Sequence, residues 1–227
     1  VNYRNHCIRD LKLDESCKVL AFASPSFDAF ESEMLMAFSL GGELHLTDKE
    51  VLRNPELLTE YLVNYQIDTL TLPPVFAEKI DFSKTEAKTL LTAGSEVKPS
   101  TVDKLKDQVN YYNAYGPTED SICSTIWEYV PYNGDSVPIG KPIPNHHVYI
   151  LNSSNKIVPI GVPGELCISG EGVARGYINR ETLTAEKFVI NPYTKERMYR
   201  TGDLARWLED GTIEYLGRVD DQIKLRG

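Results

Sequence analysis

The segment Asn113-Ala114-Tyr115-Gly116-Pro117-Thr118-Glu119-Asp120 combines an aromatic ring, a glycine-proline turn, a hydroxyl and a carboxylate. It follows residues 109–112, where apolar and polar side chains alternate as in a β-strand. We interpret it as a strand end that opens into a loop, which is where open α/β sheets hold their ligands. A tyrosine ring can stack on a base, a threonine hydroxyl can donate to a phosphate, and glutamate oxygens suit Mg²⁺. For these residues taken alone, a solvated Gly-Pro turn without a ligand is the alternative.

Residues 1–135 alternate strand-like with helix-like runs. The strand-like runs are residues 19–23, 43–46, 69–72, 90–93 and 109–112. The helix-like runs, residues 31–40, 55–66 and 99–108, carry apolar side chains at helical spacing, and Pro55 and Pro99 stand where first-turn prolines belong. This order predicts βαβ units and a mostly parallel sheet.

From about residue 136, glycine and proline separate short β-runs at residues 147–151, 164–169, 198–201 and 212–215, and residues 182–188 form the one helix-like run. The dipeptide Asp210-Gly211 between two apolar runs predicts a hairpin, because such a turn requires positive φ. The predicted fold class is therefore α/β: a βαβ parallel-sheet subdomain over residues 1–135, followed by a small β-rich, distorted barrel subdomain over residues 136–227.

Composition limits the kinds of partner. The chain has 227 residues, 41% of them hydrophobic, which is enough for one large domain or two small ones. Its net charge of −9 argues against a nucleic-acid or anionic-membrane partner. There is no signal-peptide pattern and no apolar run near the roughly 20 residues that span a bilayer. The cysteines (Cys7, Cys17, Cys123, Cys167) are far apart and predict neither a zinc site nor a disulfide framework, so we expect a cytoplasmic protein.

Four further motifs accompany the first in a fixed order. They are Phe27-Asp28-Ala29-Phe30, the glycine-rich run of residues 164–177, Tyr199-Arg200-Thr201-Gly202-Asp203-Leu204, and the final run of residues 217–227. Each motif alone is weak. At these spacings, the chain from about residue 19 to residue 227 resembles the adenylation domains of nonribosomal peptide synthetases, which share a superfamily with acyl-CoA synthetases and luciferases.

The resemblance also implies segments outside the sequence. The family's phosphate loop would lie upstream of Val1, and its small C-terminal domain, with a catalytic lysine, would follow Gly227. The chain thus resembles the second half of the large N-terminal domain. We expect these 227 residues to form no adenylate by themselves.

The resemblance implies an ATP- and Mg²⁺-dependent ligase-type enzyme that activates an amino acid to aminoacyl-AMP and pyrophosphate. The aminoacyl group would then load onto the phosphopantetheine arm of a carrier-protein domain, beside neighbouring synthetase domains, in secondary metabolism such as antibiotic biosynthesis. Three residues would act on the phosphates: Thr118 on the α-phosphate, Glu119 on Mg²⁺, and Arg218 on ribose or phosphate. The remaining ATP contacts would be Gly94, Ala114, Tyr115, Asp203 and Tyr215, of which Tyr115 stacks on adenine and Asp203 binds the ribose hydroxyls. Asp220 would be the hinge to the C-terminal domain, with Asp221 as the adjacent alternative.

The same resemblance locates an amino-acid pocket. Asp28 would pair with the substrate's α-ammonium, as one carboxylate beside a buried cation can. The rest of the wall would be Ala29, Ser32, Thr71, Leu91, Ala93, Ala114, Ile122 and Cys123. This apolar, uncharged slot suits a large flat side chain. Phenylalanine-activating relatives commonly carry tryptophan where this chain has Ser32, which leaves depth and a hydroxyl, so L-tyrosine is the favoured substrate and phenylalanine or another aromatic the alternative.

Two other functions remain open from the residues. An acyl- or aryl-CoA ligase of the same superfamily would have no reason to hold a carboxylate at Asp28, and an α/β scaffold could bind nucleotide or partner domains without turnover. We further expect Asp203 and Glu119 to be exposed at strand ends and Arg175 to anchor the glycine-rich loop. His146 and His147 have no acidic partner at a recognisable spacing in the sequence and are interpreted as surface or strand residues.

Overall fold

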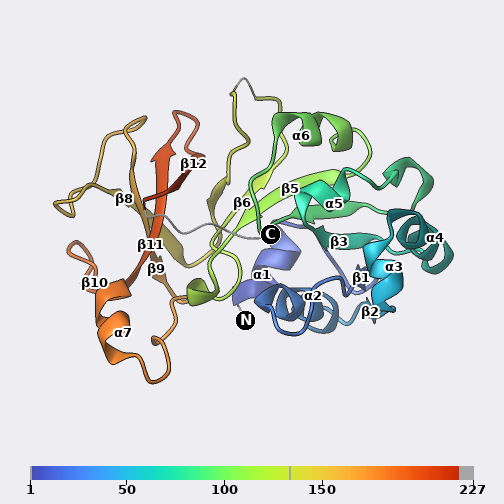
Figure 1. Cartoon of the computed structure of the whole chain (residues 1–227), viewed down its shortest axis with the longest axis horizontal. Coiled ribbons are helices and arrows are strands. Elements are labelled where there is room, and N and C mark those ends of the chain that lie inside the picture. Colours follow the sequence, from blue (N-terminus) through green and yellow to red (C-terminus); the bar gives the residue numbers. More distant parts are fainter. Residues whose placement is uncertain (1, 133, 220–227) are drawn as a thin grey trace. The chain divides into compact units, whose positions relative to one another are not determined.

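The structure is a computed structural model that describes residues 2–132 and 134–219 (Figure 1). The described residues divide into two compact units, one made of the residues up to 113 together with 128–137, the other of residues 114–127 together with residues 138–219. The boundary between residues 135 and 136 stays a prediction. The segment that carries the Tyr115–Asp120 motif belongs to the second unit.

The first unit is built on five parallel strands in the order β2-β1-β3-β4-β5. Their bounds are β1 (Lys18–Leu20), β2 (Glu43–His45), β3 (Thr69–Leu72), β4 (Thr89–Thr92) and β5 (Asn110–Tyr115). Every residue of β3 and β4 is buried, as expected of parallel strands covered on both faces. The predicted parallel sheet is confirmed, although β5 runs on through Tyr115, so the loop begins at Gly116.

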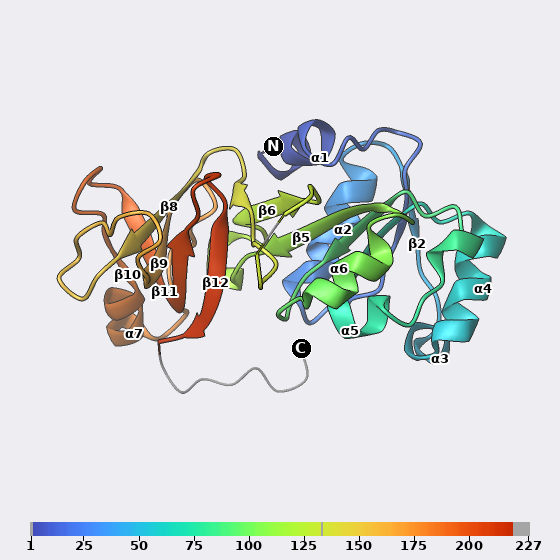
Figure 2. The same cartoon turned by 90° about the horizontal axis from the view of Figure 1, so that it is seen from above.

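Helices cover both faces of this sheet. They are α1 (Asn2–Arg9), α2 (Asp28–Phe38), α3 (Lys49–Arg53), α4 (Pro55–Tyr65), α5 (Pro74–Ala77) and α6 (Pro99–Leu105), with a 3₁₀ turn, η1, at Phe82–Lys84. Helix α2 lies on one face and α6 on the other (Figures 1 and 2). Helices α1, α3 and α5 were not predicted. Helices α3 and α5, with five and four residues, are too short to show a 3.6-residue period, and α1 is mostly polar.

Helix α4 shows how the sequence fixes an element. The Asn54 side chain accepts hydrogen bonds from the Glu56 and Leu57 N–H groups, and Pro55 occupies the first turn, where no N–H donor is required. Leu58 and Leu62 are fully buried, each stabilising the fold by about 1.5–3 kcal/mol.

The second unit is mainly antiparallel. After the 3₁₀ turn η2 (Thr118–Asp120) come β6 (Thr125–Glu128), β7 (Lys141–Pro142), β8 (His146–Leu151), β9 (Gly164–Gly170), α7 (Glu181–Lys187), β10 (Phe188–Ile190), β11 (Arg197–Trp207) and β12 (Ile213–Arg218). Strands β6 and β7 pair with each other, and β10-β11-β9-β8 form a second sheet in which β12 also pairs with β11. The predicted β-rich subdomain is confirmed.

Strand β11 differs most from its prediction. The sequence analysis ended it at residue 201 because Thr201-Gly202-Asp203 resembles a turn. In the structure the strand continues to Trp207, and its pairing with β9 is interrupted between Arg200 and Leu204. Gly202 has φ +73°, which is typical of a glycine at a β-bulge. The glycine therefore bends the strand rather than ending it.

The Asp210-Gly211 hairpin is confirmed. Trp207 of β11 faces Ile213 of β12, and Gly211 takes φ +76°. Asp210 accepts from the Thr212 N–H at 2.9 Å, which closes the turn. Ile213 then joins the core of this unit, whose other buried members are Ile139, Val148, Ile150, Val158, Leu166, Ile168 and Ala205.

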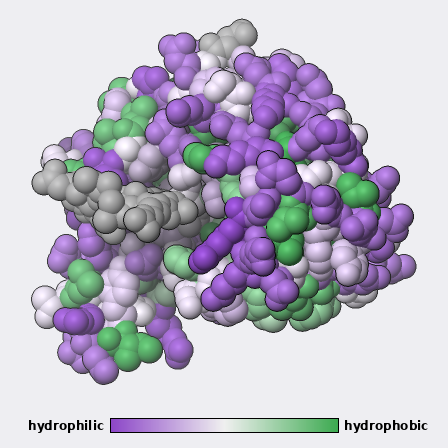
Figure 3. Space-filling model, turned by 45° about the vertical axis from the view of Figure 1, so that its right-hand side comes forward, coloured by the Kyte–Doolittle hydropathy of each residue, from purple (hydrophilic) through white to green (hydrophobic). Residues whose placement is uncertain are grey.

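The surface is largely polar. On the face in Figure 3, hydrophobic side chains form separate small patches within a hydrophilic surround. Within residues 2–132 and 134–219, no helix has the length and apolar character that a bilayer crossing requires.

Candidate nucleotide and amino-acid site

The loop after β5 folds back tightly on itself. A Cβ atom on Gly116 would lie 2.1 Å from the Ile122 carbonyl oxygen, so this position accepts only glycine without a shift of the backbone. Ser121 and Ile122 take positive φ, at 52° and 81°, which reverses the chain after η2. Thr118 is exposed and Glu119 half-buried at the tip of this turn. Two of the three predicted phosphate-side residues are therefore accessible.

The carboxylate of Glu119 is held by a tyrosine. The Tyr177 hydroxyl donates to Glu119 Oε1 at 2.6 Å, and the Tyr199 hydroxyl lies 3.5 Å from that of Tyr177. Burial, followed by the hydrogen bond to Glu119, raises the pKa of Tyr177. The phenol is thus a proton donor to the carboxylate. The sequence analysis quoted Tyr177 in the glycine-rich motif but assigned it no role.

The glycine-rich loop after β9 contacts the same turn. The Ala174 N–H donates to the Glu119 carbonyl oxygen at 2.8 Å, and Ser121 Oγ donates to the Gly172 carbonyl oxygen at 2.7 Å. The prediction that Arg175 anchors this loop is wrong: its side chain is exposed and makes no hydrogen bond or ion pair with the described residues, whereas the guanidinium of Arg197 donates to the Arg175 carbonyl oxygen. Every residue offers a backbone carbonyl as a hydrogen-bond acceptor. The sequence therefore gives no sign that Arg197 donates to the carbonyl of residue 175.

A buried acid-base pair supports this turn. Asp120 is fully buried, accepts from Ser124 Oγ at 2.6 Å, and lies with Oδ2 3.4 Å from His146 Nε2. Burial raises the pKa of Asp120 to about 6, against the opposing effects of His146 and Ser124. His146 therefore has an acidic partner, Asp120. The sequence did not indicate this contact, because the two residues are distant along the chain. His147, by contrast, is exposed as expected.

Gly172 packs directly on this pair, and we expect Gly172→Ala to lower the free energy of unfolding by about 1–3 kcal/mol through overpacking. A Cβ atom there would lie 2.2 Å from His146 Nε2 and 2.8 Å from Asp120 Oδ1. Urea unfolding of the variant measures the loss. Gly134→Ala is the control, since its added Cβ would come no closer than 3.4 Å to a neighbour. Equal stability of the two variants would contradict the packing described.

Asp203 joins three other predicted nucleotide residues. Its Oδ1 accepts from the Arg218 guanidinium at 3.1 Å, and its Oδ2 accepts from the Tyr115 hydroxyl. The Tyr115 and Tyr215 ring centroids are 6.2 Å apart. Burial, then the charge of Asp203, raises the pKa of Tyr115 well above its ordinary value. Tyr115, Asp203, Tyr215 and Arg218 therefore form one cluster within the second unit.

The expectation that Asp203 is exposed at a strand end is wrong. The residue lies inside β11 and is 5% exposed. Each carboxylate oxygen has two lone pairs, so Asp203 can accept from ribose hydroxyls while its present bonds persist. Tyr215 packs partly buried against the core around Ile213, which agrees with a structural role as well as with a place beside a nucleotide.

Glu119 is the residue suited to hold Mg²⁺. Among the described residues, no group of three or more His, Cys, Asp or Glu side chains could bind a metal ion by themselves. Mg²⁺ in nucleotide enzymes takes one or two carboxylates, with phosphates and water completing its octahedron. One half-buried carboxylate at the tip of a turn, beside the Thr118 hydroxyl, fits that requirement.

The first turns of α2 carry the start of the predicted pocket. Asp28 and Ala29 are half-buried at the helix N-terminus, and Ser32 is 5% exposed one turn later. The Ser32 hydroxyl is hydrogen-bonded to the Tyr3 phenol of α1. The hydroxyl thus already has a phenolic partner.

Neighbouring strands carry four more predicted residues. Thr71 of β3 is in register with Leu91 of β4, and Ala93 and Gly94 follow the end of β4, with Gly94 exposed at φ +86°. Thr71 is 9% exposed, and its hydroxyl oxygen has no hydrogen-bond partner among the described residues. A buried hydroxyl without a partner is costly, so Thr71 is a candidate to meet a polar group of a ligand.

Three further residues that the sequence assigns to the pocket belong to the second unit. Ala114 is half-buried in β5, Ile122 is half-buried after η2, and Cys123 is 5% exposed. Asp220, the predicted hinge, lies outside the described residues, as does Asp221.

Glu33 is a residue of α2 that sequence reasoning missed. It is fully buried, and its two carboxylate oxygens accept from the Ala23 N–H at 3.2 and 3.1 Å. Burial raises its pKa to about 8. Glu33 ties the segment before Asp28 to the helix. A buried acid within a helix is a signal that sequence alone does not distinguish from a solvated one.

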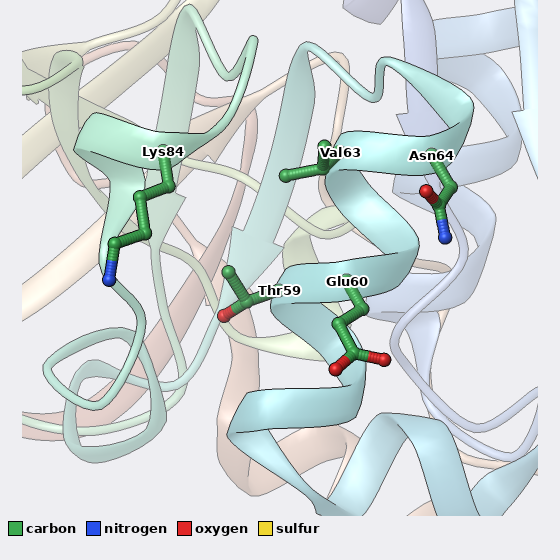
Figure 4. A pocket seen from close by; sticks show the side chains of 5 residues that line it. All are labelled: Thr59, Glu60, Val63, Asn64 and Lys84. Carbon is green, nitrogen blue, oxygen red and sulfur yellow. The ribbon is translucent and has the colours of Figure 1, made fainter.

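A surface cavity of about 390 Å³ lies away from all these residues (Figure 4). It is lined by Thr59, Glu60, Val63 and Asn64 of α4 and by Lys84. The Lys84 ammonium is already paired with Asp81 at 2.9 Å. The cavity therefore adds nothing to the candidate site.

Comparison with known proteins agrees with these motifs. Residues 1–178 match the model of a family described as AMP-binding enzyme. Tyrocidine synthase 1 of Brevibacillus parabrevis is 50% identical over 94% of this chain, and gramicidin S synthase 1 of Brevibacillus brevis is 46% identical over 96%. The chain spans 20% of the length of each.

Solved structures give the same fold. An NRPS protein containing adenylation and PCP domains superimposes with a TM-score of 0.87 at 30% identity, over 94% of this chain and 39% of that one. A further nonribosomal peptide synthetase gives a TM-score of 0.88 at 26% identity, over 96% of this chain and 25% of that one. The predicted resemblance to nonribosomal peptide synthetase adenylation domains is confirmed, and the chain belongs to the family of AMP-binding enzymes.

Proposed function

We propose that this chain forms part of an adenylating enzyme that activates an amino acid with ATP. An oxygen of the substrate carboxylate attacks the α-phosphorus of ATP, a new P–O bond forms, and pyrophosphate leaves with the electrons of the broken P–O bond. The carboxylate is already nucleophilic. The protein therefore contributes by positioning the reactants and by stabilising phosphate charge.

The cluster of Tyr115, Asp203, Tyr215 and Arg218 is the observation that carries this proposal. It combines two aromatic faces, a carboxylate that can accept from ribose hydroxyls, and a guanidinium suited to ribose or phosphate oxygens. Gly94 and Ala114 supply backbone beside the base. Thr118, exposed on the neighbouring turn, donates its hydroxyl to the α-phosphate.

Glu119 is proposed to hold Mg²⁺. When bound, the ion neutralises phosphate charge as pyrophosphate leaves. The Glu119 carboxylate must keep one orientation beside Thr118 to bind the ion. The hydrogen bond from the Tyr177 hydroxyl stabilises this orientation.

We propose L-tyrosine as the amino acid, with Asp28 pairing with its α-ammonium. Ala29, Leu91, Ala93, Ala114, Ile122 and Cys123 would supply the apolar wall. Ser32 and Thr71 are its polar members, and of these Thr71 is the one whose buried hydroxyl lacks a partner. Phenylalanine should be a measurable side substrate, because a slot that has room for a hydroxyl discriminates by only about 10².

The tyrosyl group is proposed to pass to the phosphopantetheine thiol of a carrier-protein domain. The thiolate sulfur attacks the acyl carbon and AMP leaves. One relative of known structure contains adenylation and PCP domains together, which supports this partnership. We place the reaction in the cytoplasm with neighbouring synthetase domains and without nucleic acid or membrane.

Ser32→Trp tests the amino-acid assignment. The indole would fill the depth beside Tyr3, so exchange with tyrosine should fall by about 10²-fold relative to exchange with phenylalanine. The measurement is amino-acid-dependent ATP–pyrophosphate exchange by the complete enzyme, meaning residues 1–227 joined to the phosphate loop and C-terminal domain that the resemblance implies.

Asp28→Ala is the comparison for this prediction. It removes the partner of the ammonium group that all amino acids share, so it should weaken every amino acid alike. An unchanged tyrosine-to-phenylalanine ratio in Ser32→Trp would remove Ser32 from the pocket. Full amino-acid-dependent exchange by Asp28→Ala would contradict the pairing of Asp28 with the α-ammonium group.

A further inference from the structure

Three separate hydrogen bonds join the turn that carries Glu119 to the glycine-rich loop after β9. Two of them are between Ala174 and the Glu119 backbone, at 2.8 Å, and between Ser121 and the Gly172 backbone, at 2.7 Å. The third reaches the side chain itself, from the Tyr177 hydroxyl to Glu119 Oε1 at 2.6 Å. The first two fix where the turn lies, and the third fixes how the carboxylate is oriented.

The Tyr177 phenol is itself held in place. Its ring meets Phe188 edge-on, with centroids 5.3 Å apart, and its hydroxyl lies 3.5 Å from that of Tyr199. The Tyr177 N–H donates to Thr184 Oγ1 at 2.9 Å, which ties this residue to α7. These contacts restrict the Tyr177 side chain to one orientation. Little side-chain entropy is therefore lost when its hydroxyl donates to Glu119.

A half-buried glutamate otherwise has several side-chain rotamers. Fixing one of them before the ion arrives removes an entropy cost from binding, and a donor on one oxygen leaves the other for a cation. Outer-shell partners of metal-binding carboxylates commonly have this effect, and their loss costs about 10- to 100-fold in metal affinity.

We propose that Tyr177 is a positioning residue for the cation-binding carboxylate of Glu119, an inference that rests on the proposed role of Glu119. Tyr177 has no proposed contact with the nucleotide or the amino acid. It acts on the affinity for the divalent ion through Glu119, and the glycine-rich loop places the Tyr177 hydroxyl beside that carboxylate.

The test is Tyr177→Phe in the complete enzyme, which keeps the ring and removes the hydroxyl. Mn²⁺ affinity in the presence of a non-hydrolysable ATP analogue, measured by electron paramagnetic resonance titration, should fall by about 10- to 100-fold. In exchange assays the KM for Mg²⁺ should rise similarly, and kcat should recover at saturating Mg²⁺. A role in stability alone would lower the active fraction at every Mg²⁺ concentration.

Three comparisons separate the outcomes. Tyr149→Phe removes a phenol from β8, where Tyr149 stacks on Tyr193, and should leave Mn²⁺ affinity unchanged. In a Glu119→Gln background, Tyr177→Phe should add no further loss. If Glu119→Gln weakens Mn²⁺ binding and Tyr177→Phe does not, the inference is overturned and the metal assignment stands; if Glu119→Gln has no effect, the assignment of Glu119 fails first.

Discussion

Glu119→Gln is expected to lower tyrosine-dependent ATP–pyrophosphate exchange by about 10- to 100-fold, because one charge-assisted contact contributes on the order of 1.5–3 kcal/mol. The amide keeps the size of the side chain and can still accept from Tyr177, so the turn should retain its shape. The free energy of unfolding should change little, since the side chain is half-buried on a loop.

Exchange rates and urea unfolding of the complete enzyme check both parts of this prediction. Glu171→Gln is the matched control: it is an exposed glutamate of the glycine-rich loop, and its neutralisation should leave both quantities unchanged. Wild-type exchange by Glu119→Gln would show that another residue binds the ion.

Asp203→Ala should lower exchange by a similar factor and should also destabilise the fold. The side chain of Asp203 is 7% exposed and that of its partner Arg218 is 19% exposed. Breaking a fully buried pair costs about 3–5 kcal/mol, and the partial exposure of Arg218 lowers the expected loss to about 2–3 kcal/mol. The expected loss of stability follows from the burial of Asp203, which the sequence did not indicate.

Glu214→Ala separates the two effects of Asp203. Glu214 is 8% exposed and pairs with Arg206 across the same β11–β12 ladder, but it has no proposed ligand. Glu214→Ala should have a lower free energy of unfolding and an unchanged exchange rate per folded molecule. In Asp203→Ala both the free energy of unfolding and the exchange rate per folded molecule should fall. If the two variants behaved alike, Asp203 would be a structural residue only.

The sequence predicted the repeating elements of the fold well. Strand β3 has the bounds that the pattern indicated, and α4 differs by one residue. Helix α4 was predictable because its apolar period runs over three turns and its start is marked by Asn54 and Pro55. The hairpin at Asp210-Gly211 was predictable for the same reason, since its turn chemistry is local.

Contacts between distant residues were not predictable in the same way. Thr201-Gly202-Asp203 resembles a turn but forms a bulge within β11, because pairing with β9 resumes at Leu204 and pairing with β12 begins at Asp203. His146 and Asp120 lie 26 positions apart by their numbers, and nothing local marks them as partners. The hydrogen bond from Tyr177 to Glu119 likewise depends on how the glycine-rich loop packs against the turn after β5.

The most direct test is a panel of ATP–pyrophosphate exchange rates over the proteinogenic amino acids, measured on the complete enzyme. The account predicts that L-tyrosine gives the highest rate, that phenylalanine is a measurable side substrate within about 10² of it, and that charged and very small amino acids give none. A highest rate with a charged amino acid, glycine or alanine would contradict the pocket assignment, and an absence of exchange with every amino acid would contradict the proposed adenylation itself.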